Sequence, residues 1–332
     1  MVVPHQNDTT PVVMQQEVYA SQSEWGKWHA VADWQAIGLD SFNSRQKRDN
    51  QSRAGCPTKR RWADGPALTW KLTPTAPDIL ARIVSRKREE LLEKTVSAED
   101  LRRAAQSRLA DRRDFAAALR SKHPAIISEI KKASPSRGVL IEDFRPVELA
   151  KQYQEGGAAA LSVLTDRDFF LGCDGDLCAA RAACGLPVIR KDFVISEYHV
   201  IEAASIGADA ILLIAAILDE SKLRGFRELA REFAMAALVE VHDTGELETA
   251  LRSGAEIVGV NNRDLRTFQV SLGTSIALAP RIPSTVLKVS ESGIFTAADI
   301  HGLIDVGFDA FLVGEHLVKS GDPARAIQEL IR

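Results

Sequence analysis

The sequence predicts a (β/α)8 TIM barrel, an α/β fold that a helical extension and a polar N-terminal segment precede. Eight short, β-branched apolar runs alternate strictly with amphipathic helical patterns between residues 125 and 332. Nearly continuous apolar strands between helices indicate a parallel sheet that is covered on both faces. No GxGxxG follows any of these runs, which disfavours a dinucleotide-binding open sheet. Eight such units fit a closed barrel better than an open sheet.

The composition is that of a globular protein and excludes several function classes. The chain has 332 residues, of which 45% are hydrophobic and 26% charged, with a formal net charge of −3. This charge gives no reason to expect nucleic-acid binding, and no apolar run reaches the roughly 18 residues of a membrane span. The N-terminus lacks the pattern of a secretory signal. The four cysteines form no CxxC pair, so we expect reduced thiols, no metal and a cytoplasmic location.

Residues 1–70 differ from the rest of the chain. They are polar, yet they contain all five tryptophans, and residues 25–37 form a short helical pattern with the rings roughly on one face. We expect a largely disordered extension, separate from a catalytic domain at 71–332. Two alternatives stay open: an element that docks on the barrel or on a partner, and a start codon assigned too far upstream.

The first part of the catalytic domain is predicted to be helical. Apolar residues recur at helical spacing through a charged background from Pro77 to about Lys94. Ser97, followed by two acidic residues, is typical of a capped helix start, and Asp114–Leu119 predicts one more turn. Residues 77–119 therefore form the expected helical extension.

The eight expected strands then alternate with helices. The strands are 125–130, 159–164, 187–193, 208–218, 236–241, 257–261, 286–290 and 310–313. The clearest helical patterns are 146–155, 197–206, 221–233, 245–252 and 296–306. Several of them end in a Gly that feeds a short loop into the next strand, as expected at a helix C-terminus.

Polar side chains gather at the predicted strand ends, where (β/α)8 barrels carry their chemistry. Six strand ends contribute Glu129 and Lys131; Arg190, Lys191 and Asp192; Glu240; Asn261 and Arg263; Glu291 and Ser292; Gly314 and Glu315. One charged strand end is often a loop salt bridge, but six on one rim predict an active site. Burial and a second ammonium favour a neutral lysine, whereas a facing carboxylate favours a charged one, so the charge state stays open.

The last two strand ends also predict a phosphate site. Small residues at 292–293 and 314 let backbone N–H groups approach a ligand closely. The side chain of Glu315 would repel a phosphate, so only its N–H is expected to take part. The histidines share no ligand spacing, and His242, two residues after Glu240, is expected to be structural.

Several of these segments resemble indole-3-glycerol phosphate synthase. They are Glu129–Gly138, Leu164–Thr165 with Phe169–Gly172, Arg190–Phe193, Leu238–His242, Gly259–Leu265, Glu291–Ile294 and Leu312–Glu315. The resemblance runs from about residue 77 to the C-terminus and leaves out residues 1–70. Cys173 is a departure, because the family commonly has Ser there, and we expect little effect.

The resemblance implies a lyase of tryptophan biosynthesis that needs no cofactor. Its substrate would be an anthranilate ring joined through its amine to a deoxyribulose phosphate, and the pyrrole ring would close with loss of carbon dioxide and water. By similarity, Lys191 is the general acid, and Glu240 is the base with Glu129 assisting. Lys131 would bind the carboxylate or the phosphate and share the acid role at dehydration. Which lysine gives the proton at each step stays open.

The remaining site residues also follow from the resemblance. Asn261 would orient hydroxyls and the amine, and Glu291 and Ser292 complete the expected catalytic set. The expected substrate-binding residues are Ser134, Phe170, Phe193, Arg263, Gly293, Gly314 and Glu315.

Two other function classes are open to test. A phosphoribosylanthranilate isomerase would need a Cys and Asp acid–base pair, but Cys173 follows the second strand instead of ending the first. A barrel that had become a binding or regulatory module would not need buried rim charges, which are costly. The expected partner is a phosphorylated small molecule, with no nucleic acid or membrane, and the chain is expected to be a monomer or weak homo-oligomer.

Overall fold

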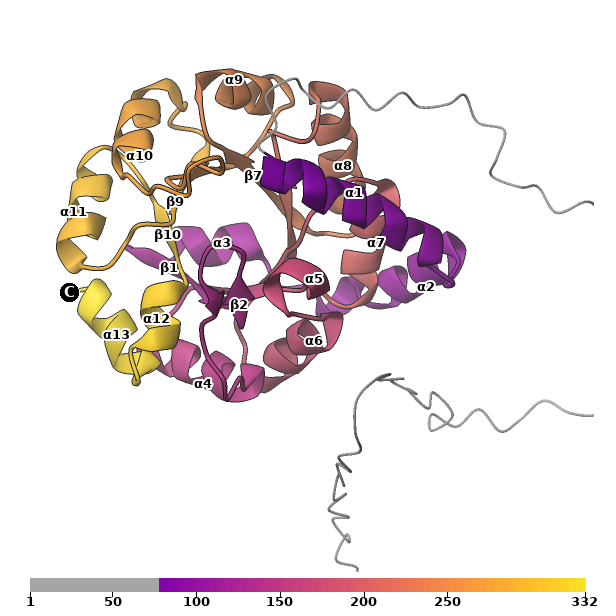
Figure 1. Cartoon of the computed structure of the whole chain (residues 1–332), viewed down its shortest axis with the longest axis horizontal. Helices are drawn as coiled ribbons and strands as arrows, with labels where there is room; N and C mark the ends of the chain where they lie inside the picture. Colours follow the sequence, from indigo (N-terminus) through magenta and orange to yellow (C-terminus); the bar gives the residue numbers. More distant parts are fainter. Residues whose placement is uncertain (1–77) are drawn as a thin grey trace, which may run out of the picture. The chain divides into compact units, whose positions relative to one another are not determined.

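The computed structural model describes residues 78–332, and within them eight parallel strands close into a barrel. Their order around the barrel is β1-β10-β9-β8-β7-β6-β5-β4 (Figure 1). The strands are β1 (Ala125–Ile130), β4 (Ala160–Leu164), β5 (Val188–Lys191), β6 (Ala210–Ile214), β7 (Ala236–Val241), β8 (Ile257–Asn261), β9 (Leu287–Glu291) and β10 (Ala310–Val313). The predicted (β/α)8 barrel is confirmed.

One helix behind each strand covers the outside of the barrel. These helices are α4 (Pro146–Gly156), α6 (Asp174–Ala183), α7 (Glu197–Ser205), α8 (Glu220–Glu232), α9 (Thr244–Arg252), α10 (Gly273–Leu278), α11 (Ala297–Asp305) and α13 (Pro323–Leu330). At the end of α4, Gly157 has a φ of +96° and its N–H reaches the carbonyls of Tyr153 and Gln154. A glycine adopts this left-handed backbone without strain, which explains the helix stop read from the sequence.

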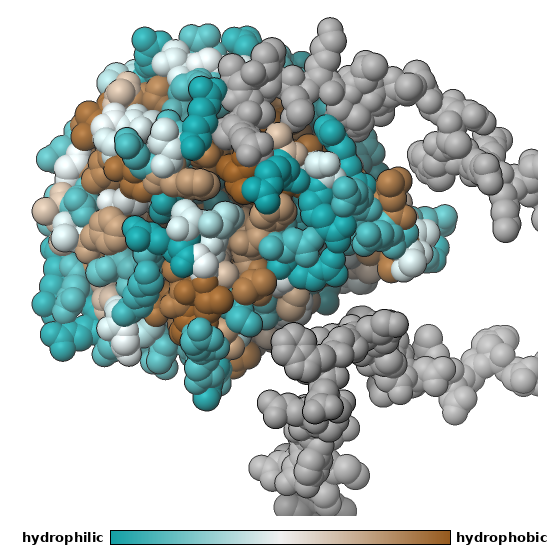
Figure 2. Space-filling view, viewed as in Figure 1, coloured by the Kyte–Doolittle hydropathy of each residue, from teal (hydrophilic) through white to brown (hydrophobic). Residues whose placement is uncertain are grey.

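Shorter elements decorate the end of the barrel at which the strands finish. A hairpin of β2 (Ala133–Ser134) and β3 (Gly138–Val139) follows β1, α5 (Arg167–Phe170) follows β4, and α12 (Glu315–Lys319) follows β10. On this face, seen in Figure 2, apolar residues are gathered between polar segments. The sequence analysis assigned neither the hairpin nor α5, α6 and α10.

The helical extension packs against both ends of the barrel. It consists of α1 (Asp78–Glu93), α2 (Ala98–Ser107), a 3₁₀ turn (Leu109–Asp111) and α3 (Phe115–Arg120). Ser97 caps α2, as predicted, and the turn expected at 114–119 is α3, which Asp114 caps. From α3, Phe115 and Leu119 join the buried cluster that fills the barrel interior, and from α1 Leu80 joins the same cluster. In Figure 1, the helix α1 lies over the rim of the barrel, from β7 toward α2.

Among residues 78–332, no helix has the length and apolar character needed to cross a membrane. The expected disordered extension at 1–70, its tryptophan helix and its docking role lie outside the described residues.

Candidate active site

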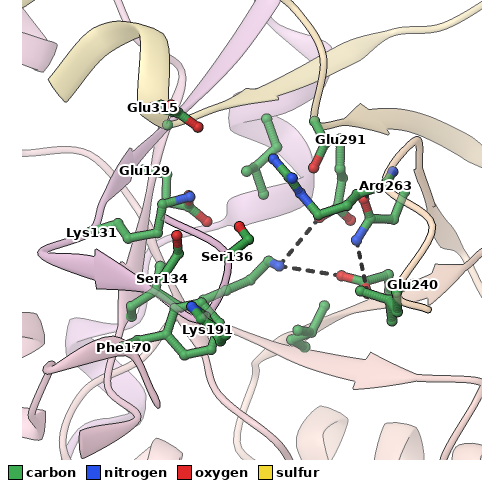
Figure 3. Close-up of a pocket in the computed structure, with 18 of the residues that line it drawn as sticks. Glu129, Lys131, Ser134, Ser136, Phe170, Lys191, Glu240, Arg263, Glu291 and Glu315 are labelled. Atoms are coloured by element: carbon green, nitrogen blue, oxygen red, sulfur yellow. Dashed lines mark hydrogen bonds and ion pairs between the residues drawn. The ribbon is translucent and has the colours of Figure 1, made fainter. Parts of the chain in front are cut away.

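An open cavity lies at the carboxyl ends of the strands. It is lined by all fourteen predicted site residues, namely Glu129, Lys131, Ser134, Phe170, Lys191, Phe193, Glu240, Asn261, Arg263, Glu291, Ser292, Gly293, Gly314 and Glu315. Figure 3 shows charged side chains from opposite sides of the barrel pointing toward one another in this cavity. The strand ends thus bring together residues up to 186 positions apart, from 129 to 315.

Lys191, at the end of β5, reaches across the barrel to two carboxylates. Its Nζ lies 3.2 Å from Oε2 of Glu240 and 3.4 Å from Oε2 of Glu291. Burial alone would lower the pKa of Lys191, but the carboxylates of Glu240, Glu291 and Glu129 outweigh it and raise this pKa above its usual value. Lys191 is therefore a charged ammonium at neutral pH, and the question left open by the sequence is answered in favour of the charged form.

Glu240, near the end of β7, is surrounded by donors. Besides Lys191, Asn261 Nδ2 donates to its Oε1 at 3.2 Å, and His242 Nε2 lies 3.4 Å from the same oxygen. Burial alone would raise the pKa of Glu240, but these three groups lower it. Glu240 and Glu246 in turn outweigh burial and raise the pKa of His242 to about 10. Glu240 is thus a carboxylate at neutral pH, and the positive charge of His242 stabilises it.

Glu291, at the end of β9, has the opposite environment. Its residue surface is 1% exposed, and its Oε1 has no hydrogen-bond partner among the described residues. Burial, together with the nearby negative charges of Glu240 and Glu129, raises the pKa of Glu291 to about 7, against the lowering effect of Lys191. Two carboxyl groups on one lysine thus differ in proton affinity, an arrangement typical of acid–base sites.

Glu129 and Lys131 form a second ion pair at the end of β1. The Glu129 side chain is 6% exposed and the Lys131 side chain 17%, so the pair lies partly within the cavity wall. The phenol of Tyr153 in α4 donates to the carbonyl oxygen of Glu129 at 3.1 Å and fixes this strand end from outside the barrel. Figure 3 shows both side chains on the opposite side of the cavity from Glu240.

The ends of β9 and β10 present backbone groups to the cavity. Ser292 has a φ of +66° and Gly293 one of +83°, so the chain turns sharply there. The buried Asn262 holds this turn, since its Nδ2 donates to the carbonyls of Glu291 and Ser292 at 3.0 and 3.1 Å. Turned backbone N–H groups of this kind can bind an anion.

The carboxylate of Glu315 is engaged elsewhere. Its Oε1 accepts from Lys319 Nζ at 2.7 Å and lies 3.9 Å from Nε of Arg137. The side chain of Glu315 thus has cationic partners of its own, and the role of its N–H in phosphate binding stays a prediction.

Aromatic residues and an arginine line the remaining walls. The rings of Phe170 and Phe193 lie 6.1 Å apart between centroids, at 38° to each other. Arg263, just after β8, donates from Nη1 to the carbonyl of Phe268 at 3.3 Å. The helix α1 adds Ile79, Leu80 and Ile83, which the sequence analysis did not assign to the site.

A buried charge network below α1 was also missed. Lys87 Nζ in α1 lies 2.9 Å from carboxylate oxygens of both Asp166 and Asp192. Arg190 lies 3.4 Å from Asp192 and 3.0 Å from Glu202. The signal was present, because position 87 falls on the same helical face as the buried Leu80, Ile83 and Val84. A lysine on an apolar face indicates a buried partner.

The described residues offer neither a metal site nor a cysteine to the cavity. Among residues 78–332, no group of three or more His, Cys, Asp or Glu side chains is arranged to hold a metal ion. None of the three described cysteines lines the cavity, and Cys173 instead caps α6. The Cys and Asp pair required by the isomerase alternative is not built at this site within the described part of the chain.

Comparison with known proteins agrees with this geometry. A family model described as Indole-3-glycerol phosphate synthase matches residues 80–330. An indole-3-glycerol phosphate synthase from Acidovorax sp. is 50% identical over 263 residues, which cover 76% of this chain and 98% of the relative. One from Chromobacterium violaceum is 49% identical over 259 residues, covering 76% and 97%.

Among solved structures, a 3-hexulose-6-phosphate synthase is similar in fold, with a TM-score of 0.50 and 17% identity over 62% of this chain and 97% of that one. The family match spans the barrel and nearly all of its helical extension, and it confirms the resemblance read from the strand ends. The chain belongs to the indole-3-glycerol phosphate synthase family.

Proposed function

We propose that the cavity carries out the reaction of the family to which the chain belongs. In this reaction 1-(2-carboxyphenylamino)-1-deoxyribulose 5-phosphate closes to indole-3-glycerol phosphate, with loss of carbon dioxide and water. The chain is accordingly a carbon–carbon lyase of tryptophan biosynthesis. The observation that supports the proposal best is Lys191, a charged ammonium held between two carboxylates of unequal proton affinity.

Lys191 is assigned the role of general acid in ring closure. As the ring carbon attacks the ribulose carbonyl, the carbonyl oxygen gains negative charge, and a proton from an ammonium cancels that charge. Loss of carbon dioxide then restores the aromatic ring. The ammonium has three N–H donors, and Glu240 and Glu291 engage two of them, so the third is available to the substrate oxygen.

Glu240 is assigned the role of base in the dehydration. With Lys191, His242 and Asn261 around it, its carboxylate is charged but weakly basic. Once Lys191 has given a proton to the substrate, it no longer carries a positive charge, and the basicity of Glu240 rises. Glu129 assists, and Lys131, which it holds, gives a proton to the leaving hydroxyl or binds the substrate carboxylate.

The two ends of the substrate are assigned to opposite parts of the cavity. The phosphate lies against Ser292 and the N–H groups of Gly293, Gly314 and Glu315, with Ser134 at its side. The aromatic ring packs on Phe170 and Phe193, and Arg263 pairs with the carboxylate. The apolar side chains of α1 then cover the substrate.

The test is a rate measurement with the carboxyphenylamino substrate, followed by indole absorbance and fluorescence. The substitution Lys191→Met should abolish turnover. Because it also removes a buried ion pair, the assay is run under conditions in which urea unfolding shows the variant to be folded. Turnover by this variant at the wild-type rate would overturn the assignment of Lys191. A wild-type protein without turnover would overturn the proposed reaction itself.

The expectations for the rest of the chain remain part of the proposal. We assign the protein to the cytoplasm, as a monomer or weak homo-oligomer, with residues 1–70 as an extension outside the catalytic domain. Deleting residues 1–70 and comparing activity and oligomer size tests this assignment. A change in oligomer size on deletion would identify the segment as a docking element instead.

A further inference from the structure

The inward face of the barrel wall carries a glycine directly beneath Glu291. Gly259 in β8 is paired in register with Glu240 on one side and with Val289 on the other. Side chains at one register level of a barrel point the same way, so position 259 faces the interior as Glu240 does. Glu291 is paired with Asn261, two residues further along, and therefore begins one level above Gly259.

The side chain of Glu291 descends into the space that Gly259 leaves empty. A Cβ at position 259 would overlap Oε1 of Glu291 and would lie 3.3 Å from its Cδ. The same Cβ would lie 3.1 Å from Cδ1 of Leu238, so the floor of this space is apolar. The oxygen that enters it is the one without a hydrogen-bond partner among the described residues, whereas Oε2 faces Lys191 at 3.4 Å.

We propose that Gly259 is a positioning residue, whose missing side chain provides a socket that holds Glu291 low in the barrel with a single oxygen on Lys191. The inference rests on the role proposed above for Lys191 as general acid, and it adds that Glu291 holds this lysine through their ion pair. The charged groups around Glu291 are Lys191 from β5, Glu240 from β7 and Glu129 from β1, and all of them line the cavity. A carboxyl group pushed up out of the socket would therefore move into the space of the cavity. There it would occupy the position of the substrate carbonyl and repel an anionic ligand.

A second glycine shows the same relationship. A Cβ at Gly314, just after β10, would overlap Oε2 of Glu129 and lie 3.1 Å from its Cδ. Two carboxylates of the cavity are therefore each accommodated by a glycine, one within and one just after a neighbouring strand. Because the backbone of Gly314 is also assigned to the phosphate, a substitution there would mix two effects, and Gly259 is the clearer position to test.

The test is a double-mutant cycle between Gly259→Ala and Glu291→Asp. The Ala methyl group displaces the end of a flexible side chain, so the variant should fold, but kcat/KM should fall about tenfold or more because a small misplacement of a reacting group is costly. In the Glu291→Asp background, where the side chain is one methylene shorter, Gly259→Ala should change kcat/KM by less than about twofold. Gly302→Ala, in α11 with nothing within 4 Å of the added Cβ, is the matched control and should leave kcat/KM unchanged.

Three outcomes decide the matter. A wild-type value of kcat/KM in Gly259→Ala would overturn the socket. So would an equal fall in kcat/KM when Gly259→Ala is introduced into the wild-type protein and into Glu291→Asp. Full activity of Glu291→Gln would instead overturn the role given to Glu291. In that case the test of the socket is the free energy of unfolding as a function of pH. If Gly259→Ala expels the carboxyl group, the change of this free energy between pH 5 and 8 should become smaller. An unchanged pH dependence would overturn the socket.

Discussion

The ion pairs of Lys87 provide the sharpest test of how α1 is held over the cavity. The Lys87 side chain is 6% exposed, and those of Asp166 and Asp192 are 0% and 7% exposed. Burial alone would lower the pKa of Lys87, but the two aspartates raise it above its usual value. Lys87→Met removes the charge and keeps most of the apolar stem, so both aspartates lose a buried partner.

The expected magnitude follows from this geometry. Removing one partner of a buried ion pair costs about 3–5 kcal/mol, because the remaining charge is left uncompensated. We expect the lower end, about 3 kcal/mol, since Arg190 still lies 3.4 Å from Asp192. A tenfold change in an equilibrium constant corresponds to about 1.4 kcal/mol. If less than half of the lost stability weakens the packing of α1 on the barrel, KM should rise about tenfold. KM should rise because Ile79, Leu80 and Ile83 of α1 line the cavity.

The assay combines urea unfolding with steady-state kinetics, and Arg103→Met in α2 is the control. Arg103 pairs with Glu99 at 3.2 Å, and the two side chains are 65% and 83% exposed, so its loss should cost about 0–1 kcal/mol and leave KM unchanged. The folded-state pKa of Asp192 is lowered, so its contribution to stability is present above the unfolded value of about 3.9 and is lost as the pH falls below it. The difference between wild type and Lys87→Met should accordingly be constant from pH 5 to 8 and shrink below pH 4. Equal effects of the two substitutions on stability and KM would refute this reasoning.

Three further substitutions test individual groups. Cys173→Ser should stabilise the protein by about 0.5–1 kcal/mol in urea unfolding at unchanged kcat, because Ser is the better N-cap for α6; a fall in kcat would contradict the expectation of little effect. Glu291, with a folded-state pKa of about 7, keeps its proton in the folded protein above the unfolded value of about 4.3, so stability falls as the pH rises through this window. Glu291→Gln should therefore be more stable than wild type at pH 8 but not at pH 5, and inactive; equal stability at pH 8 would contradict the raised pKa. Burial lowers the pKa of His199 to about 4, so stability is lost as the pH falls from about 6.5 toward 4. In His199→Gln the unfolding temperature should therefore depend less on pH across that window. An unchanged pH dependence would argue against a buried neutral imidazole.

The barrel was predictable because its pattern is repeated eight times. Strands buried on both faces are nearly all apolar, and each is followed by an amphipathic helix, so single errors of one or two residues do not change the fold class. The helices α6 and α10 were missed because they begin with Asp-Gly-Asp and Gly-Thr-Ser, which have low helix propensity. Packing of Leu177 and Ala180 into the core overrides that propensity in α6.

The members of the site were predictable, but their pairing was not. Parallel strands end at one rim, and this places Lys191, Glu240 and Glu291 together whatever the details of the barrel. Which carboxylate pairs with Lys191 depends on how the barrel closes and on the register of the neighbouring strands, which sets the height of each side chain in the barrel. Lys87 shows the same limit, since its helical face was visible in the sequence, whereas its partners Asp166 and Asp192 come from loops 79 and 105 residues away.

The charge arrangement also explains why one carboxyl group should carry a proton. The carboxyl groups of Glu240 and Glu291 share the single ammonium of Lys191, and the substrate adds a phosphate and a carboxylate. If both carboxyl groups were ionised, they would outnumber the ammonium, and an anionic substrate beside them would meet a repulsion that is poorly screened in a largely buried space. A protonated Glu291 removes one negative charge without giving up a contact to Lys191. The apolar floor beside Gly259 favours that proton, because it offers Oε1 no donor that would stabilise the carboxylate.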